Sequence, residues 1–233
     1  MVWSSYYTVD ESLSAFYEDY LRAHCRDSQV LEYGCGIDNV VSLLVANGAA
    51  SVKAIDISPV AVQQGRERLT SDEAKLVEFQ VMDAENLEFE DQSFDLICGT
   101  SILHHLDLDR AYGELARVLR HHGSAMFVEP LGHNPLINLY RRRTPDLRTP
   151  DEHPLLFDDI SEAERHFESI EPHFFYLTSL AAVPFRNLSF FRSIIGGLDR
   201  FDQFIFRHLP PARRHAWQVA IKLRGPMTES LRG

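Results

Sequence analysis

The sequence lacks long apolar runs and contains only three cysteines. Without an N-terminal apolar signal region or a stretch of about 18 apolar residues, it predicts neither secretion nor a membrane-spanning helix. Cys25, Cys35 and Cys98 do not have the paired spacing of a metal site or a disulfide framework. We therefore predict no bound metal and a soluble protein in the reducing cytoplasm.

Basic side chains are scarce in the first half of the chain. Residues 1–130 hold 9 Lys and Arg against 22 Asp and Glu, a balance of −13, and residues 131–233 hold 14 against 12, a balance of +2. A nucleic-acid partner requires a broad basic face, which the acidic half does not offer. We therefore predict no nucleic-acid partner, whereas a small acidic acceptor stays open.

The most informative segment is a glycine turn between a predicted strand and a predicted helix. Residues 30–31 are typical of a buried strand, Gly34 and Gly36 follow, and residues 40–45 suit a helix. Glycines let the backbone approach a ligand closely, as in nucleotide-type pockets at the ends of parallel strands. Glu32 stands at the entrance of the turn, where a carboxylate would repel a pyrophosphate and attract a cationic or hydroxyl-bearing ligand.

Later strand ends carry further landmarks. Asp56 ends the second predicted strand about 20 residues beyond the glycines, a spacing at which a carboxylate can accept hydrogen bonds from ribose hydroxyls. Asp83 follows the third strand, and the fourth strand, 93–98, runs into residues 99–106. Each landmark is common alone, but four in order at the spacing of βα units form a specific signature.

Hydrophobic patterns predict an α/β fold. We expect strands over 29–33, 51–56, 75–82, 93–98, 122–129, 172–178 and 216–223. Helices are expected over 9–25, 39–47, 58–69, 107–120 and from 158 to about 167. This alternation implies a mostly parallel sheet covered on both faces. The length of 233 residues fits one domain over 1–233 with two insertions.

Together these landmarks resemble the class I S-adenosylmethionine-dependent methyltransferases, whose signature reads (V/L)L(D/E)xGCGxG. The resemblance covers roughly residues 28–130, although Asp38-Asn39 stands near the position of the signature's third glycine. It implies a Rossmann-like seven-stranded sheet with an antiparallel last strand, the cofactor S-adenosyl-L-methionine and methyl transfer to a small-molecule acceptor. The competing interpretation, a dinucleotide-binding fold, requires a Gly-x-Gly-x-x-Gly that the chain lacks.

The resemblance also implies which residues bind the cofactor. In the family the glycine turn holds the methionine part, the acid after strand two holds the ribose and the acid after strand three lies beside the adenine amine. The segment after strand four lines the methyl-transfer site. The corresponding residues are Glu32, Gly34, Cys35, Gly36, Asp56, Ile57, Asp83, Ala84, Thr100 and His105. We expect Cys35 to contribute its backbone, and His104-His105 to position the cavity.

The first insertion, residues 131–157, holds the candidate acceptor-site residues. Its four prolines predict a fixed loop without regular secondary structure. A general base is required only if the acceptor atom carries a proton that it must lose. The candidates are His133 and His153, and His105 is the third choice.

Arg141 and Arg148, with Tyr140, are candidates for binding an anionic acceptor, because a guanidinium can hold two oxygens at once. The alternative is that the arginines pair with nearby acids of the same loop and staple it.

The second insertion, residues 179–215, is rich in phenylalanine with interleaved arginines and predicts one or two amphipathic helices. Besides ordinary packing on the sheet, three interpretations stay open: a cap over an acceptor pocket, a homodimer contact, or weak contact with a membrane surface. The aromatic insertion and the arginine loop predict O-methylation of a hydrophobic, lipid-linked or sugar-linked acceptor. A non-catalytic cofactor-binding protein, and an enzyme using the same pocket for other chemistry, are the alternatives.

Overall fold

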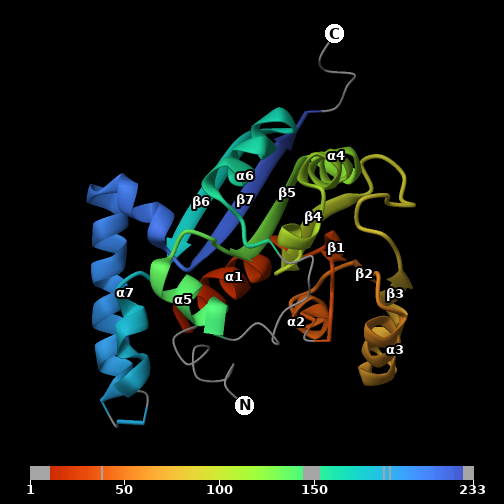
Figure 1. Cartoon of the computed structure of the whole chain (residues 1–233). Helices are drawn as coiled ribbons and strands as arrows, with labels where there is room; N and C mark the ends of the chain where they lie inside the picture. Colours follow the sequence, from red (N-terminus) through yellow and green to blue (C-terminus); the bar gives the residue numbers. More distant parts are fainter. Residues whose placement is uncertain (1–10, 38, 144–152, 186, 189, 228–233) are drawn as a thin grey trace.

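A seven-stranded sheet organises the chain in the computed structural model, which describes residues 11–37, 39–143, 153–185, 187–188 and 190–227. The strand order is β3-β2-β1-β4-β5-β7-β6, and β7 runs antiparallel to both of its neighbours (Figure 1). The strands are β1 Gln29–Tyr33, β2 Ser51–Asp56, β3 Val77–Val81, β4 Phe94–Thr100, β5 Leu119–Pro130, β6 Phe167–Phe175 and β7 Gln218–Pro226. The predicted Rossmann-like sheet with an antiparallel last strand is confirmed.

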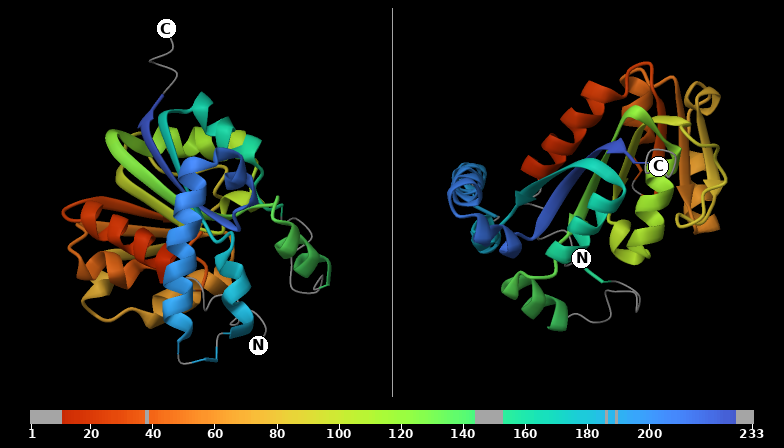
Figure 2. Two further views of the ribbon diagram at one scale, coloured as in Figure 1. Left: turned by 90° about the vertical axis from the view of Figure 1, so that its left-hand side faces the viewer. Right: turned by 90° about the horizontal axis from the view of Figure 1, so that it is seen from above.

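Helices cover both faces of this sheet (Figure 2). The α-helices are α1 Glu11–His24, α2 Val41–Ala46, α3 Pro59–Arg68, α4 Leu108–Val118, α5 Pro135–Arg143, α6 Phe157–Glu162 and α7 Phe191–His208. Short 3-10 turns are η3 Glu73–Lys75, η4 Leu103–His105, η6 Ala163–Arg165, η7 Ser179–Phe185 and η8 Pro210–His215. Among the residues that the structure describes, no helix has the length and apolar character needed to cross a bilayer.

Two apolar cores lie on opposite faces of the sheet. One joins α1, α2 and α3 to the sheet through residues such as Leu21 and Leu44, and the other joins α4 and α6 through Tyr112 and Ile160. Helix α7 lies beyond the edge strand β6 (Figures 1 and 2). It contributes residues to both cores, so the second insertion extends the sheet's edge rather than covering one face.

The prediction of an irregular loop at 131–157 is wrong for part of that segment, because α5 occupies 135–143. Asn134 caps this helix: its Oδ1 accepts hydrogen bonds from the backbone N–H groups of Leu136 and Ile137, at 3.0 and 3.1 Å. Pro135 stands at the first helical position, where proline costs no hydrogen bond. The position of each proline, rather than their number, decides whether a helix can form, and a proline at the first helical position permits one.

The sixth strand begins earlier than predicted, at Phe167 rather than 172. Pro172 lies inside β6, where a central strand would lose a ladder hydrogen bond. Because β6 is the edge of the sheet and pairs with β7 alone, the missing N–H can face away from the ladder. Pro172 is therefore consistent with β6 being an edge strand, and it does not define where the strand begins.

Candidate cofactor and acceptor site

The glycine turn follows β1 at the carboxyl edge of the sheet, next to the switch point between β1 and β4. Gly34 and Gly36 have φ values of +70° and +53°, which favour glycine. A Cβ on Gly34 would lie 2.5 Å from Cγ1 of Ile102, whereas one on Gly36 would meet no atom within 4 Å. Gly34 therefore allows the turn to pack against the segment after β4, and Gly36 borders open space.

Glu32 is buried beneath this turn. Its Oε1 accepts a hydrogen bond from the backbone N–H of Val40 at 2.7 Å, but its Oε2 has no partner among the described residues. Burial raises the pKa of Glu32 to about 8. Burial raises the pKa of the Tyr17 hydroxyl of α1, and the nearby groups of Cys98 and Glu32 raise it further. One oxygen of Glu32 thus lacks the partner that a buried acceptor requires.

Asp56 ends β2 and braces the turn from the other side. Its Oδ2 accepts from the N–H of Gly36 and its Oδ1 from that of Ser58, each at 2.8 Å. The side chain of the next residue, Ile57, is 74 % exposed. A large exposed apolar side chain beside a fixed carboxylate suits a ligand that has both an apolar face and hydroxyl groups.

Asp83 and Ala84 follow β3 and are tied to the same edge. The hydroxyl of Tyr33 donates to the carbonyl oxygen of Ala84 at 2.5 Å, and Asp83 Oδ1 accepts from the N–H of Glu85 at 2.9 Å. Cys35 donates its N–H to Ile55 O at 2.8 Å, so this backbone donor joins the turn to β2. The structure therefore brings the ends of β1, β2 and β3 together as the sequence predicted.

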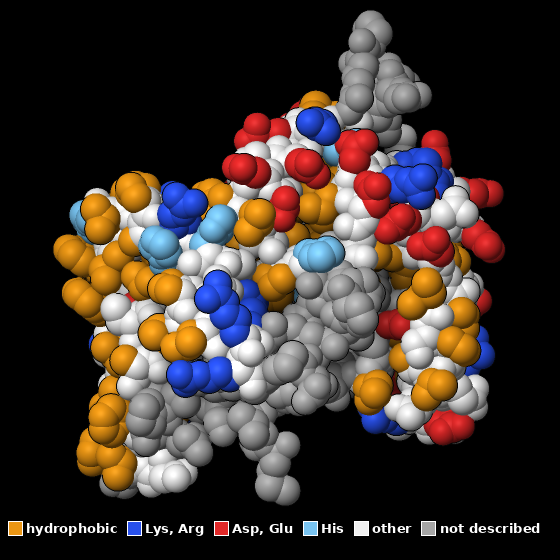
Figure 3. All heavy atoms as spheres, in the orientation of Figure 1, with side chains coloured by type: hydrophobic (Ala, Val, Ile, Leu, Met, Phe, Trp, Pro, Cys, Tyr) orange, Lys and Arg blue, Asp and Glu red, His pale blue; other side chains and the backbone are white. Residues whose placement is uncertain are grey.

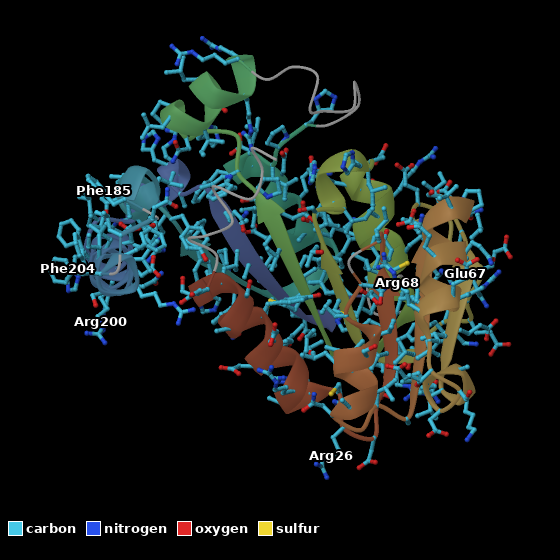
Figure 4. The ribbon with its side chains drawn as sticks, turned by 90° about the horizontal axis from the view of Figure 1, so that it is seen from below. Arg26, Glu67, Arg68, Phe185, Arg200 and Phe204 are labelled. Atoms are coloured by element: carbon cyan, nitrogen blue, oxygen red, sulfur yellow. The ribbon has the colours of Figure 1, made fainter. Side chains whose placement is uncertain are left out.

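Arg68 closes the far side of the turn. From the C-terminal end of α3, Nη1 of Arg68 donates to the carbonyl oxygen of Ile37 at 2.6 Å, which joins α3 to the turn (Figure 4).

The segment after β4 is held by a residue that the sequence analysis did not select, Glu129 at the end of β5. Its Oε1 accepts from the N–H groups of Ile102 and Leu103, at 2.9 and 2.8 Å, and its Oε2 lies 2.7 Å from Nδ1 of His104. Glu129 and His104 are buried, whereas His105 is exposed. The rings of the two histidines contact each other, with centroids 4.2 Å apart. His104 thus positions the segment that carries Thr100 and His105.

Comparison with known proteins agrees with this geometry. Residues 31–127 match a family described as the methyltransferase domain. Methyltransferase GfsG of Streptomyces halstedii is 35 % identical over 94 residues, which are 40 % of this chain and 34 % of that protein. Aklanonic acid methyltransferase DauC of Streptomyces sp. (strain C5) is 30 % identical over 106 residues, which are 44 % of this chain and 48 % of that protein.

Residues 31–127 form a methyltransferase domain of the S-adenosylmethionine-dependent kind. Phosphoethanolamine N-methyltransferase 2 of Haemonchus contortus, solved in complex with S-adenosyl-L-methionine, shares the fold with a TM-score of 0.66 at 14 % identity. That likeness covers 96 % of this chain and 56 % of the solved one. The matches to the two curated methyltransferases span less than half of their lengths, 34 % and 48 %.

The predicted bases lie on separate segments. His153 donates its backbone N–H to His104 O at 3.1 Å, so the end of the first insertion lies against η4. His133 follows β5, and its Nε2 accepts from the N–H of Phe157 at 3.4 Å. His105 occupies the last position of η4. The structure ties His153 to the segment of His105, and holds His133 at the start of α6.

The predicted acceptor-binding residues are described only in part. Nη1 of Arg141 donates to the carbonyl oxygen of Leu131 at 3.1 Å and to Oδ1 of Asn138 at 3.2 Å. These contacts staple α5 to the end of β5. Arg148 and the side chain of Tyr140 lie outside the described residues, so their predicted roles stay predictions.

The residues at the glycine turn fit S-adenosylmethionine. The unpartnered Oε2 of Glu32 can accept a hydrogen bond from an ammonium donor, and Asp56 presents a carboxylate at the strand end where a ribose partner is predicted. Gly36 leaves open space in which no Cβ intrudes, and Ile57 offers an uncovered apolar surface. No group of three or more His, Cys, Asp or Glu within the described ranges is arranged to hold a metal ion.

Proposed function

We propose that residues 1–233 act as one methyltransferase domain that binds S-adenosylmethionine at the glycine turn and transfers its methyl group to a small-molecule acceptor. The observation that carries this proposal is the buried Oε2 of Glu32, which lacks a partner at the turn. An ammonium group would satisfy that oxygen and offset the cost of burying the carboxylate.

When bound, the cofactor supplies a methyl group activated by its positive sulfur. The chain's own residues then have to bind and orient the cofactor and the acceptor and to exclude water. Alignment of the acceptor atom with the methyl group and the sulfur supplies most of the acceleration. Glu32 would bind the cofactor's ammonium group, and Asp56 would accept hydrogen bonds from its ribose hydroxyls. Asp83 and Ala84 would bind its adenine amine. Thr100 and His105 line the side from which the acceptor enters.

For the acceptor we propose an oxygen atom of a hydrophobic, lipid-linked or sugar-linked compound. The phenylalanine-rich second insertion supports an apolar acceptor, and the arginines of the first support an anionic group. The name of the relative DauC, an aklanonic acid methyltransferase, supports an acidic acceptor. A hydroxyl acceptor would lose its proton to His153 or His133, and His105 is the third candidate for this role. His153 is supported by the hydrogen bond that ties its backbone to His104.

The three buried, unpaired thiols of Cys25, Cys35 and Cys98 support the proposed cytoplasmic location.

Calorimetric titration with S-adenosylmethionine and, separately, with NAD tests the cofactor proposal. We expect micromolar binding of S-adenosylmethionine and no binding of NAD.

Asp56→Asn should weaken binding of S-adenosylmethionine by about 1.5–3 kcal/mol, the value of a hydrogen bond to a charged group. Asp19→Asn, on the exposed face of α1, is the matched control. Tight binding of NAD, or an Asp56→Asn affinity equal to that of the control, would overturn the assignment. Methyl transfer itself is then measured with isotopically labelled cofactor and a panel of acids and phenols.

A further inference from the structure

The outer face of the second insertion is an exposed aromatic surface. Phe201 and Phe204 of α7 are 52 % and 57 % exposed. All the exposed phenylalanines of the described chain lie in this insertion, and its exposed large apolar residues are Phe185, Leu188, Phe190, Phe201, Phe204 and Leu209. We call these six residues the apolar face. Figure 3 shows apolar side chains gathered over α7, and Figure 4 shows Phe185 and Phe204 at the outer edge, away from the sheet.

A groove between η7 and the first half of α7 forms part of this face, because Phe185, Leu188 and Phe190 of the face also line the groove. Its lining is entirely apolar: Ala181, Ala182, Phe185, Leu188, Phe190, Ile194 and Leu198. Exposed phenylalanines beside a wholly apolar groove form a contiguous patch of the kind that marks an interaction site rather than scattered surface residues.

The acidic and basic side chains of α7 lie on different faces of the helix. Asp202 is buried, and Asp199 is half-buried with a pKa that burial raises. Arg200 and Arg207 are exposed. Arg192 is also exposed, but its Nη2 lies 3.3 Å from Oε1 of Glu11 in α1, so this arginine pairs with an acid on the body of the protein. The acids of α7 therefore face the body of the protein, and Arg200 and Arg207 face outward. Most of the remaining surface is acidic, because residues 1–130 carry a balance of −13.

The apolar face is held in a fixed position by Asp202. Its carboxylate accepts hydrogen bonds from the backbone N–H groups of Leu177, Thr178 and Ser179 and from the hydroxyls of Thr178 and Ser179, between 2.5 and 3.1 Å. Five hydrogen bonds to one buried carboxylate fix α7 against the end of β6. Exposure of the aromatic side chains is thus a property of an anchored helix.

We propose that this face of the η7–α7 insertion docks on an anionic lipid bilayer surface. Phenylalanines on one side of a helix lying in the interface enter the boundary between headgroups and acyl chains, and arginines beside them contact anionic headgroups. The apolar groove accepts part of an acyl chain. The acidic remainder of the molecule is repelled by the same surface, which orients the protein with α7 toward the lipid.

Charge favours lipid over a second copy of the chain as the occupant. Two copies joined through this face would bring Arg200 and Arg207 of both around one interface, while the acids of both helices point inward. Like charges placed together across an interface oppose association. An anionic bilayer instead supplies the complementary charge.

Co-sedimentation of the full chain with phosphatidylcholine vesicles, with and without phosphatidylglycerol, tests the proposal. We expect binding to the anionic vesicles and much weaker binding to neutral ones. Arg200→Gln with Arg207→Gln should weaken the partition coefficient about fivefold for each arginine. Phe201→Ser with Phe204→Ser should weaken it by roughly tenfold or more. Leu76→Ser, an exposed apolar residue far from α7 in sequence, should leave binding unchanged.

Circular dichroism and cofactor titration of each variant show whether it is folded, and cofactor titration separates this proposal from the methyltransferase proposal. Absence of wild-type binding to anionic vesicles would overturn the docking proposal. Binding that both double variants retain would also overturn it. A dimer in sedimentation velocity that Phe201→Ser with Phe204→Ser dissociates, without vesicle binding by the wild type, would assign the face to self-association instead.

Discussion

Glu129 and His104 form a buried pair, with Oε2 of Glu129 2.7 Å from Nδ1 of His104 and side chains 0 % and 4 % exposed. The pair joins the end of β5 to the segment after β4. Because His153 donates its N–H to the carbonyl oxygen of His104, the pair also sets the position of the first insertion. One carboxylate thus fixes two of the segments that border the acceptor side of the site.

Glu129→Gln should lower the free energy of unfolding by about 2–3 kcal/mol. Glutamine has one acceptor oxygen, whereas Glu129 accepts from two backbone N–H groups and a histidine, so the new amide would face a donor. Urea denaturation measures the change. Glu171→Gln, whose side chain is 45 % exposed, is the control, and equal stability of the two variants would contradict the role assigned to Glu129.

Stability of the cofactor-free protein should fall as pH rises toward 8. Burial raises the pKa of Glu32 from 4.5 to about 8, so between these values the unfolded chain has lost a proton that the folded chain retains. The fall should level off above the folded pKa. Thermal denaturation across this range, compared between wild type and Glu32→Gln, measures it. A slope equally steep in the variant would contradict the assignment.

Cofactor binding should have the opposite dependence on pH. The ammonium group pairs with the ionised form of Glu32, so affinity for S-adenosylmethionine should rise as pH approaches about 8 and binding should release a proton. Calorimetry in two buffers with different ionisation enthalpies counts that proton. Glu32→Gln should show weak binding, no proton release from this group and a flatter pH profile.

Gly34→Ala and Gly36→Ala should affect different properties: the first chiefly the stability of the fold, and the second chiefly the affinity for the cofactor. A Cβ on Gly34 would lie 2.5 Å from Ile102 and would force the turn away from the segment after β4. At Gly36 the Cβ enters open space, so folding bears only the backbone strain of about 1–2 kcal/mol. We expect Gly34→Ala to be the less stable in urea. Gly36→Ala should stay folded and lose cofactor affinity, and unchanged affinity would place the cofactor elsewhere.

Asp202→Ala should release α7 from the end of β6. The substitution leaves the backbone N–H groups of 177–179 without their buried acceptor, which should cost about 2–4 kcal/mol of stability. Hydrogen exchange should quicken at these amides and along 191–208. Asp109→Ala, at an exposed position in α4, is the control. Full protection of 177–179 in Asp202→Ala would exclude the anchoring role.

Strand-end acids predicted much of the candidate cofactor site. Glu32, Asp56 and Asp83 lie where a parallel sheet brings strand ends together, and the glycine turn joins them. Applied to the fifth strand, the same rule would have selected Glu129 in Val128-Glu-Pro130. No comparable pattern in the sequence selects Tyr17, because its approach to Glu32 depends on how α1 packs over the sheet.

The sequence by itself determined the strands and α-helices of the described residues up to 130 to within a few residues at their ends. It also determined the glycine turn and the order of the acids. These features depend on residue periodicity and on backbone angles that neighbouring residues set. Tertiary structure alone decided that Glu129 meets His104 and that Asp202 meets Thr178, pairs separated by 25 and 24 residues. It also decided which face of α7 stays exposed. An amphipathic pattern shows that a helix has two faces, but only packing against β6 and η7 determines which of its apolar residues are buried.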